Sequence, residues 1–257
     1  MNNYEKLEGM VAATFTPLDE NGDVNLSVID KYADWIASTP IKGVFVCGTT
    51  GEFSSLTIDE RNLILEKWLV SARKRFKVIA HVGSNCQRSA MELARHAAQV
   101  GADAIASIAP SFFKPGTVDE LVDFFAPICH SAAGLPFYYY NMPSITGVNL
   151  PVDKFLVEGK KKIPNLVGTK FTHNNLMEMG VCIELEQHRF EVLHGYDEIL
   201  ISGLAMGAVA GVGSTYNYIP NVYQAIFDSM KMNDLETARH NQIKSIRTVE
   251  VIICLLY

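Results

Sequence analysis

The sequence predicts an α/β protein that folds as a (β/α)8 barrel (TIM barrel), because short apolar runs alternate with longer helical patterns along the chain. Most of the runs are apolar throughout, as is typical of parallel strands covered on both faces. Eight runs in 257 residues match a barrel, whereas a doubly wound sheet would need fewer strands and a crossover. No linker or repeat divides the chain, so we expect one domain over residues 1–257.

Eight apolar runs are the expected strands, and in chain order they cover residues 10–15, 43–47, 78–82, 104–109, 137–140, 166–170, 190–193 and 209–213. The fifth run ends in three tyrosines. Because side chains alternate between the faces of a strand, Tyr138 and Tyr140 share one face and Tyr139 lies on the other.

Helical patterns fill the intervals between these strands. Apolar residues recur at three- and four-residue steps over 26–36. Thr57 and Glu60 have the spacing of a capping box, which predicts a helix from there to about residue 76. Gly101 ends the next helix, which contains Leu93 and Ala97. Further helices are expected at 118–130, 152–158, 176–187 and 198–206, and from about 220 to the end.

Composition and charge exclude several classes of protein. The chain is 48% hydrophobic with a formal net charge of −6, so it is neither disordered nor basic enough for a nucleic-acid partner. The uncharged stretch 199–227 holds several glycines and Pro220, which favours a buried helix and strand over a membrane span. Five scattered cysteines indicate free thiols, and the first residues lack a secretory signal. We therefore expect a cytoplasmic protein with no membrane partner.

Lys170 is the most unusual residue at a predicted strand end, and in such barrels the active site lies at the carboxyl ends of the strands. A free lysine has a pKa of about 10.4, and burial lowers it. A neutral amine there could attack a carbonyl and form a Schiff base. Gly168, two residues earlier on the same face, is expected to leave space below the amine. The alternative is a lysine whose amine extends into solvent at the rim.

Two other strand ends carry groups that suit an organic acid. The second strand runs into a turn, residues 47–52, in which glycines flank Thr49 and Thr50; its backbone N–H groups could bind a carboxylate, or it could be a plain glycine-rich turn. The fifth strand ends at Tyr140, whose hydroxyl could transfer a proton. The alternative is that its ring simply packs in the core.

The last two strand ends favour recognition of hydroxyl groups. Asp197 and Glu198 follow the seventh strand, where they could bind hydroxyls, cap the next helix, or do both. Ser214 follows the eighth strand, in a region that binds phosphate in many barrels, but the match to a nucleotide loop is poor. The sequence contains no HExxH pair and no calcium-loop pattern, so we expect no metal and no cofactor.

Taken together, these strand ends resemble a known family. The segments 48–52 and 140–147 and the strand-six lysine are similar to the pyruvate-dependent class I aldolase superfamily that contains dihydrodipicolinate synthase. The segments 195–198 and 213–217 resemble its N-acetylneuraminate lyase (sialic acid aldolase) branch. The similarity runs from about Gly9 to the end of the chain.

The resemblance implies an activity and a role for each residue. The activity is the reversible cleavage of N-acetylneuraminate to pyruvate and N-acetylmannosamine, in which a protonated imine accepts the electrons of the C3–C4 bond without a metal. Lys170 would form the imine and Tyr140 would transfer the proton. The other implied site residues hold the pyruvyl carboxylate (Thr49, Thr50), line the site (Thr172) or contact the sugar tail (Gly195, Asp197, Glu198, Ser214).

Two departures from the superfamily bear on the branch. Synthases usually carry Arg where this chain has Ile145, which cannot make a charge-assisted bond to a carboxylate. They also use a tyrosine lent by a neighbouring subunit, whereas Phe112 and Phe113 have no hydroxyl. Both disfavour the synthase. The family usually continues for several dozen residues more and is typically tetrameric, so we expect a shortened C-terminal helical extension and a homo-oligomer.

Two alternative functions remain open at this point. One is a related aldolase acting on another keto-sugar acid, in which case alanine at Asp197 or Glu198 would leave the KM for sialic acid unchanged. The other is a protein that binds a keto acid or sialic acid without turnover, in which case no pyruvate would be released.

Overall fold

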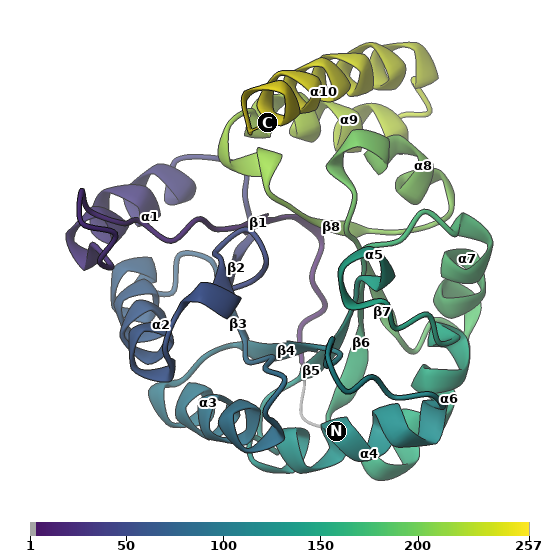
Figure 1. Ribbon diagram of the computed structural model, residues 1–257. Helices are drawn as coiled ribbons and strands as arrows, with labels where there is room; N and C mark the ends of the chain where they lie inside the picture. The colour runs from purple at the N-terminus through teal and green to yellow at the C-terminus, as the bar shows by residue number, and fades with distance from the viewer. Residues whose placement is uncertain (1–3, 257) are drawn as a thin grey trace.

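Eight parallel strands close into a barrel in the order β1 to β8 in the computed structural model, which describes residues 4–256 (Figure 1). Every neighbouring pair is parallel, including β8 with β1, which closes the sheet. The strands are β1 (Gly9–Ala13), β2 (Gly43–Val46), β3 (Lys77–His81), β4 (Ala104–Ile108), β5 (Phe137–Asn141), β6 (Leu166–Phe171), β7 (Glu191–His194) and β8 (Ala210–Gly213). The predicted fold class is confirmed.

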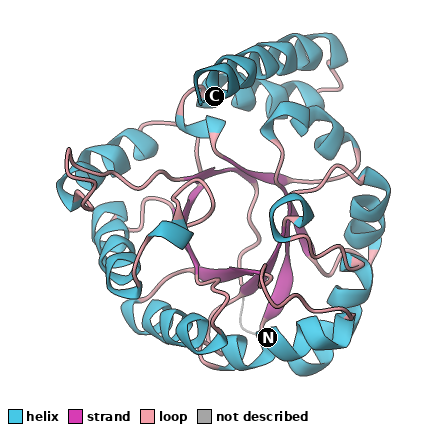
Figure 2. Cartoon of the chain, viewed as in Figure 1, coloured by secondary structure: helices cyan, strands magenta, loops and turns pink. Residues whose placement is uncertain are grey.

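Helices surround the barrel on the outside (Figure 2). Those in the barrel layer are α1 (Ile29–Ala37), α2 (Ile58–Ala72), α3 (Gln87–Val100), α4 (Val118–His130), α6 (Val152–Lys162), α7 (Leu176–Glu184) and α8 (Leu200–Ala205). The last two helices, α9 (Pro220–Lys231) and α10 (Leu235–Leu256), pack against each other beside β8 and β1. A short helix, α5 (Pro143–Thr146), was not predicted.

Local signals account for most helix ends. The capping box is confirmed, because the Thr57 hydroxyl accepts from the Glu60 N–H and the Glu60 carboxylate accepts from the Thr57 N–H. The helix it opens ends at Ala72 rather than near residue 76, because Arg73 and Lys74 adopt left-handed φ angles of 50° and 59°. Helix α7 likewise ends before the predicted residue 187, where three successive residues have positive φ.

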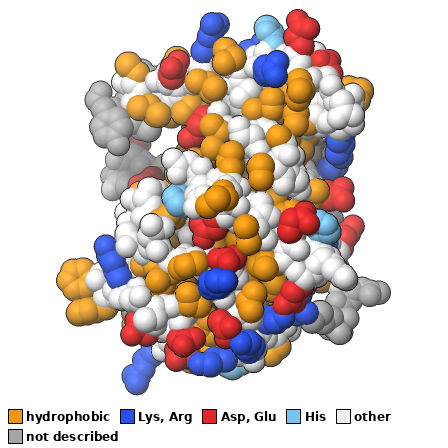
Figure 3. Space-filling view, turned by 90° about the vertical axis from the view of Figure 1, so that its right-hand side faces the viewer, with side chains coloured by type: hydrophobic (Ala, Val, Ile, Leu, Met, Phe, Trp, Pro, Cys, Tyr) orange, Lys and Arg blue, Asp and Glu red, His pale blue; other side chains and the backbone are white. Residues whose placement is uncertain are grey.

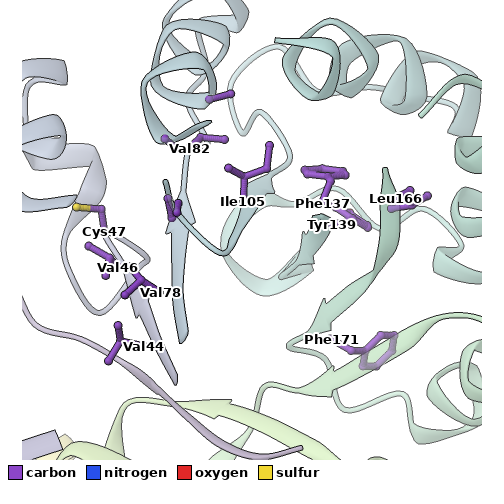
Figure 4. Close-up of a cluster of buried hydrophobic side chains, with 14 of the residues drawn as sticks. Val44, Val46, Cys47, Val78, Val82, Ile105, Phe137, Tyr139, Leu166 and Phe171 are labelled. Atoms are coloured by element: carbon purple, nitrogen blue, oxygen red, sulfur yellow. The ribbon is translucent and has the colours of Figure 1, made fainter. Parts of the chain in front are cut away.

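The hydrophobic core has two layers, one inside the barrel and one between strands and helices. Figure 4 shows the outer layer, in which strand residues such as Val44 and Ile105 point toward the helices. Tyr139 belongs to this layer and packs on Phe155 with ring centroids 4.6 Å apart. Tyr138 and Tyr140 lie in the inner layer, as the alternation of faces predicted.

The amino-terminal end of the barrel is closed by the first described residues. The buried Glu191 carboxylate accepts from the Leu7 N–H at 3.0 Å and from the Tyr138 hydroxyl at 2.9 Å. Burial raises the pKa of this carboxyl. The first described residues are therefore tied to the inner layer of the barrel at this end. On the face that Figure 3 shows, basic and acidic side chains are interspersed rather than gathered by sign.

Candidate active site

A cavity of about 450 Å³ opens at the carboxyl ends of the strands. Its lining contains all nine residues predicted from the sequence, which are Thr49, Thr50, Tyr140, Lys170, Thr172, Gly195, Asp197, Glu198 and Ser214. A larger hollow of about 1170 Å³ lies at the opposite end of the barrel, where strands begin, and contains none of the nine. We take the smaller cavity as the site because it holds the groups able to do chemistry.

Lys170 lies in this cavity and does not extend into solvent, since only 4% of it is exposed. Its Nζ lies 4.1 Å from the ring centroid of Tyr140 and 4.4 Å from that of Phe45. No carboxylate oxygen of the described residues lies within 4 Å of this nitrogen in an ion pair. Aromatic faces stabilise an ammonium and also leave the amine free to face a ligand.

Gly168 does not leave space below the amine, so that prediction is wrong. A Cβ at this position would overlap the carbonyl oxygen of Glu191 on the neighbouring strand β7. The glycine therefore permits the close approach of two strands, beside a register shift in the pairing of β5 with β6, and does not create space below the amine.

Tyr140 holds its hydroxyl beside the turn that carries Thr49 and Thr50. Its Oη lies 3.1 Å from Thr49 Oγ1, a pair in which either oxygen can donate. The same hydroxyl donates to the thioether sulfur of Met142 at 3.1 Å. The phenol thus lies between the amine of Lys170 and the turn that carries Thr49 and Thr50.

The turn is fixed from below by His81, which the sequence analysis missed. His81 Nδ1 lies 2.8 Å from the carbonyl oxygen of Cys47, whose φ is 54°, and the Ile108 N–H donates to its Nε2 at 3.3 Å. These partners select the neutral tautomer with the proton on Nδ1. Burial, and secondarily the nearby Arg61, holds the pKa of His81 well below its usual value. A neutral histidine therefore supports the turn; only contacts across three strands reveal this.

Asp197 does not cap the helix that follows β7, so the prediction of that role is wrong for this residue. Its Oδ2 accepts from the N–H and the hydroxyl of Thr215, at 2.8 and 2.6 Å. Its Oδ1 has no hydrogen-bond partner among the described residues, and a Cβ at Gly213 would overlap it. Burial raises the pKa of Asp197 to about 6 despite the Thr215 bonds, which lower it. The oxygen without a partner is itself buried against Gly213, so the Asp197 carboxylate is held by Thr215 on one side and shielded from solvent on the other.

Helix α10 contributes to the site, which the strand-end analysis did not predict. The Gln242 side chain donates to the Asp197 carbonyl at 3.0 Å and accepts from the Ile201 N–H at 2.8 Å, so it fixes the loop after β7. The further cavity residues that were not predicted lie on this helix (Val249, Ile252, Ile253), on strands β1 and β8 (Ala13, Val212, Gly213), and on the segments that follow strands (Phe15, Met142, Tyr196, Thr215, Tyr218). The spacing of apolar residues along a helix indicates which of its faces is buried, but it does not indicate that α10 lies beside the cavity.

We expect Gly195→Ala to damage the site. A Cβ there would overlap Thr172 Oγ1 and lie 2.8 Å from Thr172 Cα, and backbone atoms cannot move aside easily. Overpacking of this kind costs about 1–3 kcal/mol of stability, and we expect the displaced Thr172 to reduce kcat/KM as well. Thermal denaturation and a steady-state assay would measure both losses. Gly134→Ala is the control, because nothing lies within 4 Å of its Cβ; equal effects of the two variants would contradict the assignment.

Asp197 is expected to make stability depend on pH. Its pKa is about 6 in the folded protein and near 3.8 when exposed, so the folded state binds the proton more tightly. Its contribution to the free energy of unfolding is therefore largest below pH 4 and is lost as the pH rises through about 6. Urea unfolding from pH 4 to 7 should show the advantage of the wild type over Asp197→Asn shrinking by on the order of 1–3 kcal/mol. An advantage that grows with pH would contradict this.

Other features lie outside the cavity. Ile145, Phe112 and Phe113 are 59%, 78% and 87% exposed and do not line it.

Within residues 4–256, no cluster of three or more histidine, cysteine or acidic side chains is arranged to hold a metal ion. The described helices include none with the length and apolar character needed to cross a membrane.

A barrel with a buried lysine, a tyrosine hydroxyl and paired threonines at its carboxyl end has the groups of a Schiff-base-forming enzyme. The chain belongs to the dihydrodipicolinate synthetase family, whose model matches residues 6–254. It is 42% identical to N-acetylneuraminate lyase of Mus musculus over 252 residues, 97% of this chain and 79% of that protein.

Solved structures give the same relationship. The N-acetylneuraminate lyase (sialic acid aldolase) of Aliivibrio salmonicida superposes with a TM-score of 0.95 at 37% identity, covering 97% of this chain and 83% of that one. A catalytic lysine mutant of the Ruminococcus gnavus sialic acid aldolase superposes with a TM-score of 0.89 at 28% identity, covering 95% and 79%.

Proposed function

We propose that this chain is a class I aldolase that cleaves N-acetylneuraminate reversibly to pyruvate and N-acetylmannosamine. The observation that carries the proposal is the buried amine of Lys170, which lies in the cavity over the ring of Tyr140, whose hydroxyl is paired with Thr49 of the Thr49–Thr50 turn. The likeness to N-acetylneuraminate lyases over 97% of the chain supports the choice of substrate.

The proposed reaction begins when the deprotonated amine of Lys170 attacks the keto carbon of the open-chain sugar acid. Loss of water gives a protonated imine. A base removes the proton of the C4 hydroxyl, the C3–C4 bond breaks, and its electron pair moves into the imine to form an enamine. Tyr140 is the proposed carrier of this proton and returns one to C3. Hydrolysis of the imine then releases pyruvate and frees the amine.

The rest of the cavity divides between the two ends of the substrate. In this proposal Thr49 and Thr50 bind the carboxylate next to the keto carbon. Thr172 lines the space above the amine, and its buried hydroxyl has no hydrogen-bond partner among the described residues. Four residues contact the hydroxyl-bearing tail (Gly195, Asp197, Glu198, Ser214).

Borohydride trapping tests the proposal. Incubation with pyruvate and borohydride should reduce the imine to a stable secondary amine, and peptide mass spectrometry should find the added mass on Lys170. A coupled assay should detect pyruvate released from N-acetylneuraminate. An adduct on another lysine, or none, would contradict the assignment of the nucleophile. Trapping of pyruvate without cleavage of N-acetylneuraminate would contradict the substrate.

We also propose that the protein is a cytoplasmic homotetramer. All five cysteines are free, which suits a reducing compartment. Phe112 and Phe113 lie on an exposed loop with ring centroids 5.0 Å apart, and large exposed aromatic groups favour association. Light scattering coupled to size exclusion should give the mass of four chains. A monomer mass at micromolar concentration would contradict this assembly.

A further inference from the structure

Met142 places a sulfur atom against the group proposed to transfer protons. Its Sδ accepts from the Tyr140 hydroxyl at 3.1 Å and lies 3.8 Å from Thr49 Oγ1. The side chain is half-buried and lines the cavity. Its backbone is fixed, because its carbonyl accepts from the N–H groups of Ile145 and Thr146 at 3.2 and 3.1 Å. The main chain at Met142 is therefore held in place, and its half-buried side chain lines the cavity with the sulfur against the phenol.

A thioether is a weak acceptor, so it holds the phenol proton loosely. Oxidation converts it into a sulfoxide, which is polar and carries an oxygen that accepts hydrogen bonds strongly. From the position of Sδ, that oxygen would compete with the substrate for the Tyr140 hydroxyl.

We propose that Met142 is an oxidation-sensitive site that controls the Tyr140 proton, a proposal that rests on the proposed role of Tyr140. Hydrogen peroxide is the oxidant. Its O–O bond breaks, one oxygen bonds to Sδ, and the other leaves as water; sulfur loses two electrons and peroxide gains them. The sulfoxide oxygen then takes the hydrogen bond of the Tyr140 hydroxyl, and turnover falls.

Other oxidisable groups can be separated from Met142. Met177 and Met232 are 78% and 71% exposed, so they oxidise readily, but neither lines the cavity. Cys47 adjoins the carboxylate-binding turn, yet burial raises its pKa to about 11, which leaves little of the reactive thiolate. Reversible oxidation of the exposed Cys86 and Cys254 is undone by dithiothreitol, whereas methionine sulfoxide is restored by methionine sulfoxide reductases.

The experiment treats the full-length protein with hydrogen peroxide, removes the peroxide with catalase, reduces thiols with dithiothreitol, and then measures pyruvate release from N-acetylneuraminate. We expect activity to fall about tenfold or more, because proton transfer contributes roughly 10²–10⁴-fold to such reactions. The loss should follow sulfoxide formation in the Met142 peptide and be reversed by the reductases. Met142→Leu should keep most of its own untreated activity, while the control Met177→Leu should lose activity as the wild type does.

Three results would overturn the proposal: a fully oxidised Met142 with full activity, a loss of activity without oxidation of Met142, or a Met142→Leu protein as sensitive as the wild type. If the Leu variant does not fold, the time course and reductase rescue of the wild type decide alone. Exchange of pyruvate methyl hydrogens with deuterium, followed by NMR, provides a second readout. If the protein does not cleave N-acetylneuraminate but catalyses an exchange that peroxide abolishes, the proposed substrate is contradicted and the role of Met142 is supported. If the untreated protein catalyses no exchange, both the proposed function and the role of Met142 are overturned.

Discussion

Replacement of Lys170 by alanine should reduce pyruvate release by roughly 10⁴-fold or more, since loss of a covalent nucleophile in other enzymes costs up to about 10⁶-fold. The structure gives the reason. The amine is buried among the rings of Tyr140 and Phe45 and faces the cavity, and no other lysine within residues 4–256 lines it. Steady-state assays of pyruvate release from N-acetylneuraminate would measure the loss, with enough variant enzyme added to detect a rate lowered by this factor.

Two controls separate chemistry from folding. Lys170→Met keeps most of the buried chain length, so a melting temperature near that of the wild type would show that the barrel is intact. Lys170→Arg keeps the charge but stays protonated and cannot form an imine. Both should be inactive and unlabelled by pyruvate and borohydride. Substantial turnover by any of the three variants would contradict Schiff-base catalysis at this residue.

The Tyr140→Phe variant should lose roughly 10²–10⁴-fold in kcat, the usual contribution of a positioned acid or base. The substitution removes one hydroxyl, whose neighbours are Thr49 Oγ1 and Met142 Sδ, and keeps the ring against Lys170. At saturating pyruvate, borohydride labelling of Lys170 should therefore persist. Rapid-quench measurements of labelling and turnover on the same samples would show whether turnover falls while labelling of Lys170 persists.

Tyr139→Phe is the matched control for this variant. Tyr139 precedes Tyr140 on the same strand but points into the outer layer, where its hydroxyl accepts a long 3.5 Å bond from Asn141. Its loss should leave kcat within a few-fold of the wild type. Equal losses in the two variants would show that Tyr140 acts through packing and not through its hydroxyl.

Local patterns were sufficient to predict the barrel. Apolar runs alternate with helical patterns in the sequence because each strand is covered on both faces and each helix on one. The ends of every predicted strand therefore lie within two residues of the observed ends. Helix ends were predicted less well where no glycine or proline marks them. Arg73 and Lys74 adopt left-handed backbone angles that nothing in their residue type indicates.

The sequence predicted the strand-end residues that line the candidate site, but it did not predict the residues that hold them in place. Lysine, tyrosine and the threonine pair stand out because each breaks an apolar run or a plain turn. His81 did not stand out, because its role depends on Cys47 and Ile108, which are 34 and 27 residues away along the chain. Gly168 was noticed for the wrong reason, since the close strand it accommodates is β7.

The sequence by itself determined the fold class and the residues that face the cavity, because strand periodicity and a strand's carboxyl end are local properties. Only the tertiary structure decided whether Lys170 would be buried or solvated, that Asp197 would bond to Thr215, and that Met142 would touch the Tyr140 hydroxyl. Those outcomes depend on distances between atoms that only barrel closure and the docking of α10 bring together. Such distances are not encoded in the spacing of residues along the chain.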